Sequence, residues 1–407
     1  MTPTNLIHTL RRRAELQPGV PAIVDRTFWG DRVLGYAALN RSVDFLALRL
    51  SEEGIRHGDQ VLMLLDPSHE LYLFLLALLQ IGAVPALCDS WAGLNRFSQW
   101  LDQSQPQACI LPQSKLLAQR FHRQLRPIPK KLFPQAFHFE NRILRIGRLG
   151  TPMELPVEDL ALIELRKTLP GTLTARGWTQ SQLARSVQRL ANHLKLKAGE
   201  IDLCERPLLF LANLTAGVTS VIPVRPGPLS RSRRNRQVEK FKPIRVTAPS
   251  AFLLHYLRTS SSPLHKVFIL DAPLPADTLE FFVSCQHFAN IELLFGEDSP
   301  LASCSLPSYQ NVGIDGWVGD PFDDVRIQVE PAEDSMGATQ KPIDGPSRPP
   351  PPGELLVCGN FLAKPLSLDG KVDRSGLVVS ENGEEWIRTG HRGLLHDDGK
   401  FTVAIKI

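Results

Sequence analysis

The sequence predicts an α/β protein built mainly on parallel sheets, followed by a smaller β-rich unit. Over roughly the first three hundred residues, helix-period segments such as residues 40–53 alternate with short apolar runs such as residues 60–65. This alternation is typical of crossover units on parallel sheets. After about residue 307 the pattern changes to short strands separated by turn residues. We therefore expect a large α/β region over residues 1–306, with an internal boundary near 150–160, and a β-rich unit over residues 307–407.

The individual elements follow from the same periodicity. Residues 40–53 place Val43, Leu46, Ala47 and Leu50 on one helical stripe, and Gly54 follows where a helix commonly ends. The other elements expected in the large region are helices at 70–80 and 181–194 and strands at 60–65, 83–87, 161–165, 207–211 and 266–270. In the β-rich unit we expect strands at 325–329, 354–358, 377–379 and 401–405.

Composition excludes several classes of protein. A chain of 407 residues with 43% hydrophobic and 22% charged residues is neither disordered nor fibrous. The net charge of +4 is too small to indicate any class of partner. Six cysteines without a C-x-x-C pair indicate neither a zinc site nor a disulfide framework. Because no secretory signal is visible at the start either, we expect a cytoplasmic protein.

Residues 71–88 carry no charge over eighteen positions, which is the length at which a membrane-spanning helix is considered. Gln80, Gly82 and Pro85 interrupt this run. We therefore interpret it as a buried helix followed by a buried strand, and expect no membrane span.

A basic segment over residues 225–245 holds eight Lys or Arg residues and one Glu. Its arginines could contact phosphates, but no aromatic residue is interleaved before Phe241, and Pro226 and Pro228 flank the cluster. We expect residues 231–236 to form a solvated loop without a role in nucleic-acid binding.

The common signatures of catalysis and metal binding are missing. No G-x-S-x-G, H-E-x-x-H, Walker or G-x-G-x-x-G motif stands in its expected context, and the eleven histidines lack metal-ligand spacing. The residues alone therefore indicate neither a metal site nor a catalytic residue.

A collinear set of segments nevertheless resembles one enzyme family. They are Leu34-Gly-Tyr-Ala-Ala-Leu-Asn-Arg41, Gly54-Ile-Arg-His-Gly-Asp-Gln-Val61, Ile81-Gly-Ala-Val-Pro85, Gly353-Glu-Leu-Leu-Val-Cys-Gly359 and Trp386-Ile-Arg-Thr-Gly-His-Arg-Gly393, with Asp397-Asp-Gly-Lys-Phe401 continuing the last. Together they resemble the adenylate-forming superfamily of acyl-CoA synthetases, AMP-dependent ligases and luciferases. The resemblance implies the adenylation fold, in which layered, mainly parallel sheets are followed by a smaller β-rich subdomain.

Two further segments narrow the branch. Trp91-Ala-Gly-Leu-Asn-Arg96 and Gly217-Val-Thr-Ser-Val-Ile-Pro223 look most like the olefin-biosynthesis branch. Its members are similar to fatty acyl-CoA ligases but close β-hydroxy fatty acids into β-lactones. The resemblance thus implies ATP and Mg²⁺ as cofactors and a fatty or β-hydroxy fatty acid as substrate.

The phosphate loop of the superfamily, T-S-G-[ST]-T-G-x-P-K-G, falls without gaps on residues 166–175, between a strand and a helix. Such loops direct backbone N–H groups at phosphate oxygens, and Pro170 has no N–H to offer. Thr168 stands where the motif has glycine, and Thr174 replaces its lysine. The resemblance places the degenerate loop positions of the nucleotide site at Arg166, Lys167, Thr168, Gly171, Thr172 and Thr174.

The remaining ATP motifs depart as well. The adenine segment S-x-G-x-P corresponds to residues 269–273, where Asp271 and Ala272 stand at the glycine and the residue after it. Residues 295–299 match [YF]-G-x-T-E through Phe295 and Gly296, but Ser299 replaces the magnesium carboxylate. His391 occupies the ribose-binding aspartate of T-G-D, and a neutral imidazole accepts only one hydrogen bond. Lys406 replaces the arginine of the hinge. The family has a C-terminal lid domain after this hinge, and we expect that domain to be absent here.

Four altered nucleotide motifs on a retained scaffold predict a non-catalytic member of the family without a cofactor, acting as an acyl-group binder or as partner of an active homologue. The alternative is an active acyl-adenylating ligase with altered nucleotide contacts and a lid supplied by a separate chain. Neutral changes in an active enzyme and a decaying gene product without a selected role also stay open, as do the acyl substrate and the oligomeric state.

Overall fold

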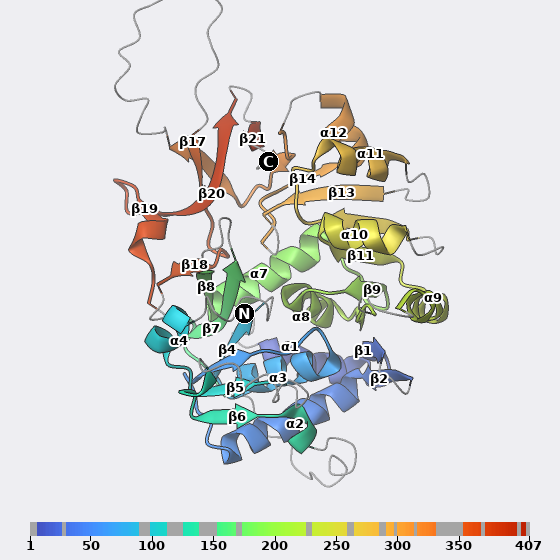
Figure 1. Cartoon of the computed structure of the whole chain (residues 1–407), viewed down its shortest axis with the longest axis vertical. Coiled ribbons are helices and arrows are strands. Elements are labelled where there is room, and N and C mark those ends of the chain that lie inside the picture. Colours follow the sequence, from blue (N-terminus) through green and yellow to red (C-terminus); the bar gives the residue numbers. More distant parts are fainter. Residues whose placement is uncertain are drawn as a thin grey trace, which may run out of the picture. The chain divides into compact units, whose positions relative to one another are not determined.

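Two compact units make up the chain. The computed structural model describes residues 6–26, 30–88, 98–111, 125–137, 153–167, 173–224, 230–258, 264–284, 290–296, 299–312, 316–330, 353–367, 371–396 and 400–403. Unit 1 holds residues 1–230 and 361–373, and unit 2 holds residues 231–360 and 374–407. Figure 1 shows helices and strands alternating along the chain up to α12, after which strands predominate.

Unit 1 is organised around a seven-stranded sheet with the order β18-β8-β7-β4-β3-β5-β6. From β7 to β6 the neighbouring strands are parallel, whereas β8 is antiparallel to both of its neighbours. The strands are β3 (Gln60–Met63), β4 (Val84–Cys88), β5 (Ala108–Ile110), β6 (Lys130–Leu132), β7 (Leu160–Lys167), β8 (Leu173–Thr179) and β18 (Lys364–Leu366).

A second group of strands in unit 1 has β1 (Pro21–Arg26) antiparallel to β2 (Asp31–Gly35) and parallel to β10 (Thr219–Val221), which pairs in parallel with β9 (Ile201–Cys204). The helices of this unit are α1 (Leu6–Leu16), α2 (Tyr36–Glu52), α3 (His69–Gln80), α4 (Ser98–Ser104), α7 (Gln180–His193), α8 (Pro207–Ala216) and the 3₁₀ turn η4 (Pro134–Phe137).

Unit 2 combines a mixed α/β part with an antiparallel sheet. In the first part β11 (Arg245–Ala248), β12 (Lys266–Ile269) and β13 (Asn290–Phe295) are parallel, and β14 (Ala302–Ser305) and β15 (Asp320–Pro321) continue in antiparallel pairs. Its helices are α9 (Ser230–Phe241), α10 (Ser250–Leu257), α11 (Ala276–Ser284) and α12 (Leu306–Val312). The antiparallel sheet contains β16 (Arg326–Glu330), β17 (Gly353–Cys358), β19 (Leu377–Val379), β20 (Glu385–Leu395) and β21 (Phe401–Val403), with the 3₁₀ turn η7 (Arg374–Gly376) before β19.

The uncharged run over residues 71–88 forms α3 and β4, as predicted. Ser68 caps the helix by accepting a hydrogen bond from the backbone N–H of Leu71 at 3.2 Å. Every residue of α3 from Leu71 to Gln80 is buried, which explains why the run carries no charge. Gly82 then turns the chain with a φ of +71°, a backbone conformation that favours glycine. No helix in the described part of the chain is both long and apolar enough to cross a membrane.

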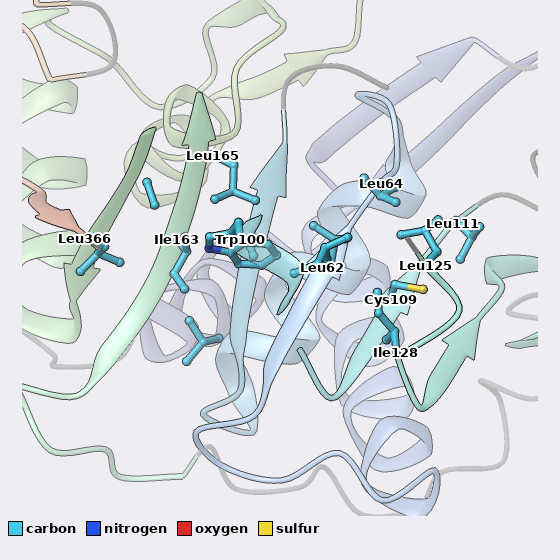
Figure 2. Packing of buried hydrophobic residues seen from close by; sticks show 14 residues of the cluster. Leu62, Leu64, Trp100, Cys109, Leu111, Leu125, Ile128, Ile163, Leu165 and Leu366 are labelled. Atoms are coloured by element: carbon cyan, nitrogen blue, oxygen red, sulfur yellow. The ribbon is translucent and has the colours of Figure 1, made fainter. Parts of the chain in front are cut away.

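A hydrophobic cluster holds the seven-stranded sheet to α4 (Figure 2). Trp100 of α4 is 1% exposed and lies among the side chains of Leu62 from β3 and Ile163 from β7. Removing a large aromatic side chain from such a position costs about 3–5 kcal/mol of stability. The cluster therefore fixes the strands whose ends carry the predicted phosphate loop.

The strand predicted at residues 207–211 is wrong, because these residues form the first half of α8. All residues from Leu208 to Leu214 are buried, so the segment shows no helical stripe and cannot be told from a buried strand by periodicity. Pro207 in the first turn and Gly217 at the C-cap, with a φ of +79°, are the signals that mark the helix.

The exposed loop predicted at residues 231–236 is also wrong. This segment lies in α9, with Arg234, Gln237 and Val238 buried on one side of the helix. Arginine is a good helix former, and its long aliphatic stem can be buried. The cluster of arginines at residues 231–236 therefore lies on a helix with a buried face, where the sequence predicted a loop.

The predicted fold class is confirmed: helices and mainly parallel sheets are followed by a β-rich part. The domain boundaries predicted near residues 150–160 and 306 stay predictions. The two compact units are defined by how densely residues pack together, and the first boundary between them lies at Ser230.

Candidate functional site

The adenine-segment residues and the aromatic motif lie together in unit 2, at the carboxyl ends of parallel strands. Asp271 and Ala272 follow β12, and Phe295 is the last residue of the neighbouring strand β13. The backbone N–H of Ala272 donates to the carbonyl oxygen of Leu294 at 3.3 Å, so the two segments run side by side. In open α/β sheets this edge is where ligands bind.

Asp271, which stands where the motif has glycine, bonds to the start of α10. The backbone N–H of Ser250 donates to Oδ1 of Asp271 at 2.7 Å, and the hydroxyl of Ser250 donates to Oδ2 at 2.6 Å. A carboxylate at a helix N-terminus is stabilised by the helix dipole and by such charge-assisted hydrogen bonds. The side chain therefore ties the end of β12 to α10, and both of its oxygens are engaged.

Phe295 is enclosed by two other rings of unit 2. Its centroid lies 5.3 Å from that of His391 on β20 in an edge-to-face arrangement, and 5.7 Å from that of Phe401 on β21. Phe295 is 2% exposed and Phe401 is fully buried. The structure thus brings the predicted positions Phe295 and His391 into direct contact, which sequence spacing could not indicate. An aromatic ring that stacks on a nucleotide base must have an accessible face, whereas the ring of Phe295 is packed within the protein.

Gly296 and Ser299 form a tight turn after β13. The backbone N–H of Ser299 donates to the carbonyl oxygen of Gly296 at 3.0 Å. Gly296 has a φ of +104°, and a Cβ placed on it would come within 2.7 Å of the carbonyl oxygen of Ser299. The glycine of this motif therefore has a structural reason to be present, independent of any nucleotide.

Arg166 and Thr174, two of the phosphate-loop positions, lie in unit 1 on the paired strands β7 and β8. Arg166 and Thr174 face each other across the two strands. The guanidinium of Arg166 forms a two-point ion pair with Glu164, with Nε 2.8 Å from Oε2 and Nη2 2.9 Å from Oε1. Because Glu164 is only 8% exposed, this pair is well shielded from water. Arg166, one of the two charges that the loop segment offers to a phosphate, is therefore already neutralised within the same strand.

The hairpin also corrects the expected local order, because the loop joins two antiparallel strands and α7 begins only after β8. Thr174 lies in β8, and its hydroxyl is 3.5 Å from the carbonyl oxygen of Arg166. Lys167 ends β7, and its side chain lies outside the described residues. Thr168, Gly171, Thr172 and Lys406 also lie outside them.

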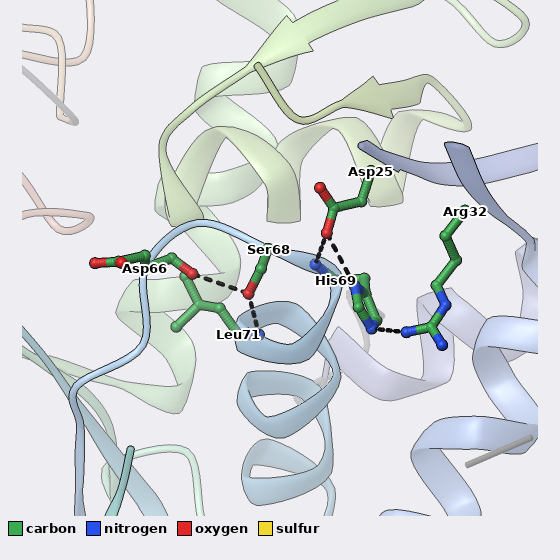
Figure 3. A network of polar contacts seen from close by, with 6 residues as sticks. All are labelled: Asp25, Arg32, Asp66, Ser68, His69 and Leu71. Atoms are coloured by element: carbon green, nitrogen blue, oxygen red, sulfur yellow. Dashed lines mark hydrogen bonds and ion pairs between the residues drawn. The ribbon is translucent and has the colours of Figure 1, made fainter. Parts of the chain in front are cut away.

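A polar network in unit 1 has no counterpart in the sequence predictions (Figure 3). Asp25 of β1 accepts hydrogen bonds from the backbone N–H of His69 at 3.1 Å and from its ring Nδ1 at 2.9 Å. Arg32 of β2 donates to Nε2 of the same ring. His69 is the first residue of α3 and is 6% exposed. The network joins the β1–β2 hairpin to α3, and no motif or residue spacing in the sequence predicts it.

In the described ranges, no three His, Cys, Asp or Glu side chains group closely enough to hold a metal ion.

Comparison with known proteins shows which family this chain resembles. The family model for AMP-binding enzymes matches residues 10–137. The olefin β-lactone synthetase of Stenotrophomonas maltophilia is 27% identical over 265 residues, which cover 61% of this chain and 48% of that protein. Over these residues the chain is similar to the adenylate-forming superfamily. It spans about half the length of this curated relative.

Two further comparisons bear on the branch and the fold. A medium/long-chain-fatty-acid–[acyl-carrier-protein] ligase of Mycobacterium tuberculosis is 30% identical over 130 residues, covering 31% of this chain and 23% of that ligase. The O-succinylbenzoate CoA synthetase of Bacillus subtilis in complex with AMP superposes with a TM-score of 0.74 at 17% identity, over 97% of this chain and 77% of the synthetase. The adenylation fold expected from the sequence is confirmed, and the chain resembles fatty acyl ligases and olefin β-lactone synthetases.

Proposed function

We propose that this chain is a non-catalytic member of the adenylate-forming superfamily, which binds an acyl group or partners an active homologue. The observation that carries the proposal is the packing of Phe295 against His391 and Phe401. With 2% of its surface exposed, Phe295 offers no face to a purine base. Binding a base there would require the ring to leave its place between its two neighbours.

The charged residues of the site support the same proposal. Asp271 is bonded to Ser250 at the start of α10, and Arg166 is paired with Glu164. Recruiting Arg166 to a phosphate would break its ion pair with Glu164, which is only 8% exposed, and breaking a shielded pair is unfavourable. Asp271 and Arg166 therefore serve the fold. Neither replaces the charged contacts that the family motifs make with phosphate and magnesium.

The size of the effect follows from the replaced charges. Losing the loop lysine to Thr174 or the magnesium carboxylate to Ser299 removes a charge-assisted contact worth about 1.5–3 kcal/mol. If both losses act, binding of the nucleotide or the transition state weakens by about two to four powers of ten, at about 1.4 kcal/mol per decade. Turnover at a useful rate is not expected after such a loss.

The alternative is an active acyl-adenylating ligase that acts on a fatty or β-hydroxy fatty acid with a lid supplied in trans. It is favoured by the fold, which superposes with a TM-score of 0.74 on a synthetase that holds AMP. In that case Phe295 and His391 must separate when the nucleotide binds.

Isothermal titration calorimetry separates the two functions. ATP, AMP and a non-hydrolysable analogue of a long-chain acyl-adenylate are titrated into the whole chain, with an active olefin β-lactone synthetase as positive control. We expect no heat from ATP or AMP at millimolar concentration. Tight binding of ATP with Mg²⁺, together with carboxylate-dependent ATP–pyrophosphate exchange, would establish the alternative instead.

A further inference from the structure

A surface pocket of about 480 Å³ lies in unit 1, between α1 and α7 and over the end of α8. We call it the α1–α7 groove. Its volume is in the range of ligand sites, and its described lining shares no residue with the candidate nucleotide site. Leu6, Thr9, Arg13 and Leu16 of α1 line it at helical positions i, i+3, i+7 and i+10. At about 1.5 Å per residue this wall runs for about 15 Å, or three helical turns.

The charge of the groove has one sign. His8, Arg12 and Arg13 line it, and none of its described lining residues is acidic. His8 and Arg12 are exposed. Arg13 is held in place, because its Nε and Nη2 donate to the carbonyl oxygen of Thr215 at 2.9 and 2.6 Å. A guanidinium that is already ordered loses little conformational entropy when an anion approaches.

One end of the groove also offers an apolar side chain to solvent. Leu16, at the end of α1, is 66% exposed, more than the other exposed large hydrophobic residues of the described chain. Ala184 of α7 lines the opposite wall with a small side chain, which leaves room for an occupant. The exposed Leu16, with Ala184 opposite and Arg12 and Arg13 beside it on a wall of three helical turns, is the complement of an acidic amphipathic helix.

We propose that the α1–α7 groove docks an acidic amphipathic helix of about three turns from a partner protein. Apolar residues of that helix pack on Leu16 and against Ala184, and its carboxylates meet Arg12 and Arg13. The length of the wall and the exposure of Leu16 favour an elongated occupant over a small anion. The inference is independent of whether the nucleotide site is active.

A synthetic peptide tests the inference on the whole chain. The probe is a fluorescent 14-residue peptide with Leu at positions i, i+3, i+7 and i+10 and Glu at the flanking positions. Its twin carries Lys in place of every Glu. We expect the acidic peptide to bind, its affinity to fall as salt rises, and the basic twin to bind at least about tenfold more weakly. Hydrogen exchange should show protection of residues 6–16 by the acidic peptide.

Two variants locate the site. Arg12→Glu should weaken binding of the acidic peptide about fivefold or more. Arg41→Glu is the matched control, because Arg41 is an exposed arginine on α2 of the same unit outside the groove, and it should leave binding unchanged. Both positions are exposed, so circular dichroism should confirm that the variants fold.

Three results would overturn the proposal. One is equal binding of the two peptides, or no binding of the acidic one below about 0.1 mM. Another is an equal effect of Arg12→Glu and Arg41→Glu. The third is protection of residues 6–16 by sodium decanoate but not by the acidic peptide, which would make the groove a site for a small anionic amphiphile.

Discussion

Asp25 accepts two hydrogen bonds from His69, one from its backbone N–H at 3.1 Å and one from its ring Nδ1 at 2.9 Å. Nδ1 of the ring faces Asp25 and Nε2 faces the guanidinium of Arg32, so the ring is held from both sides. The three side chains thereby join β1, β2 and the first turn of α3. An ionised carboxylate accepts stronger hydrogen bonds than a protonated carboxyl does. The contact between the hairpin and the helix is therefore strongest while Asp25 is ionised.

The first prediction concerns the pH dependence of stability. Burial alone would raise the pKa of Asp25, but the hydrogen bonds from the side chain and backbone of His69 outweigh it and lower the pKa below 3.8. A carboxyl with a lowered pKa in the folded state stabilises the protein above its unfolded pKa, and this contribution is lost as the pH falls through the folded value. Asp25→Asn should therefore lower the free energy of unfolding at pH 7 by about 1–2 kcal/mol, with a smaller difference at pH 3.

Urea unfolding at the two pH values measures this difference. Asp102→Asn is the control, because Asp102 is exposed on α4. It should have little effect at either pH. A constant deficit of Asp25→Asn from pH 3 to 7 would show that the ionised form of Asp25 is not what stabilises the hairpin.

The second prediction uses a pair of glycines. Gly296 and Gly383 both have a positive φ, of +104° and +82°. An added Cβ at Gly296 would meet the carbonyl oxygen of Ser299 at 2.7 Å, whereas at Gly383 it would meet nothing within 4 Å. Gly383→Ala should cost about 1 kcal/mol for the backbone conformation alone, and Gly296→Ala about 1–3 kcal/mol more. Equal losses of thermal stability would mean that the turn at Ser299 relaxes freely.

The third prediction tests whether Arg166 serves the fold. Glu164→Gln leaves the guanidinium of Arg166 shielded beside a neutral amide, so stability should fall by about 2 kcal/mol. The control is Glu52→Gln, which breaks the ion pair of Glu52 with Arg49 on the surface of α2. That change should cost less than about 1 kcal/mol. Denaturant titration compares the two, and a smaller loss for Glu164→Gln than for Glu52→Gln would contradict the structural role.

The sequence predicted α3 and β4 correctly because Gln80, Gly82 and Pro85 interrupt the uncharged run between the helix and the strand. It failed at α8, where burial on all sides removes the helical stripe. It failed at α9 because residues 231–236 show their charges but not the buried face that Arg234 shares with Gln237. Local signals thus predict an element when its exposed and buried faces differ in chemistry, and they mislead when the faces are alike or when a charged side chain is buried.

The site was predictable only as a set of positions. The family motifs identified Phe295 and His391, but their contact depends on how β13 and β20 pack within unit 2. The pair of Arg166 with Glu164 follows the two-residue period of a strand, so sequence reasoning could have found it once β7 was assigned. The bond from Asp271 to Ser250 joins separate elements and leaves no local pattern.

The last prediction is that restoring single motif residues does not restore activity. Thr174→Lys and His391→Asp each return one charged group of the family motifs, but Phe295 stays packed against Phe401 in the first variant and Ser299 stays neutral in both. Each restored contact supplies about 1.5–3 kcal/mol, at most about two powers of ten in rate. We expect no carboxylate-dependent ATP–pyrophosphate exchange above the no-enzyme background with fatty or β-hydroxy fatty acids, for the unmodified chain or for either variant. Thermal melts with and without ATP provide an independent readout, and neither variant should be stabilised by the nucleotide. Exchange in the unmodified chain that disappears on mutating Gly171 would mean that the loop of residues 166–175 binds phosphate with backbone groups alone.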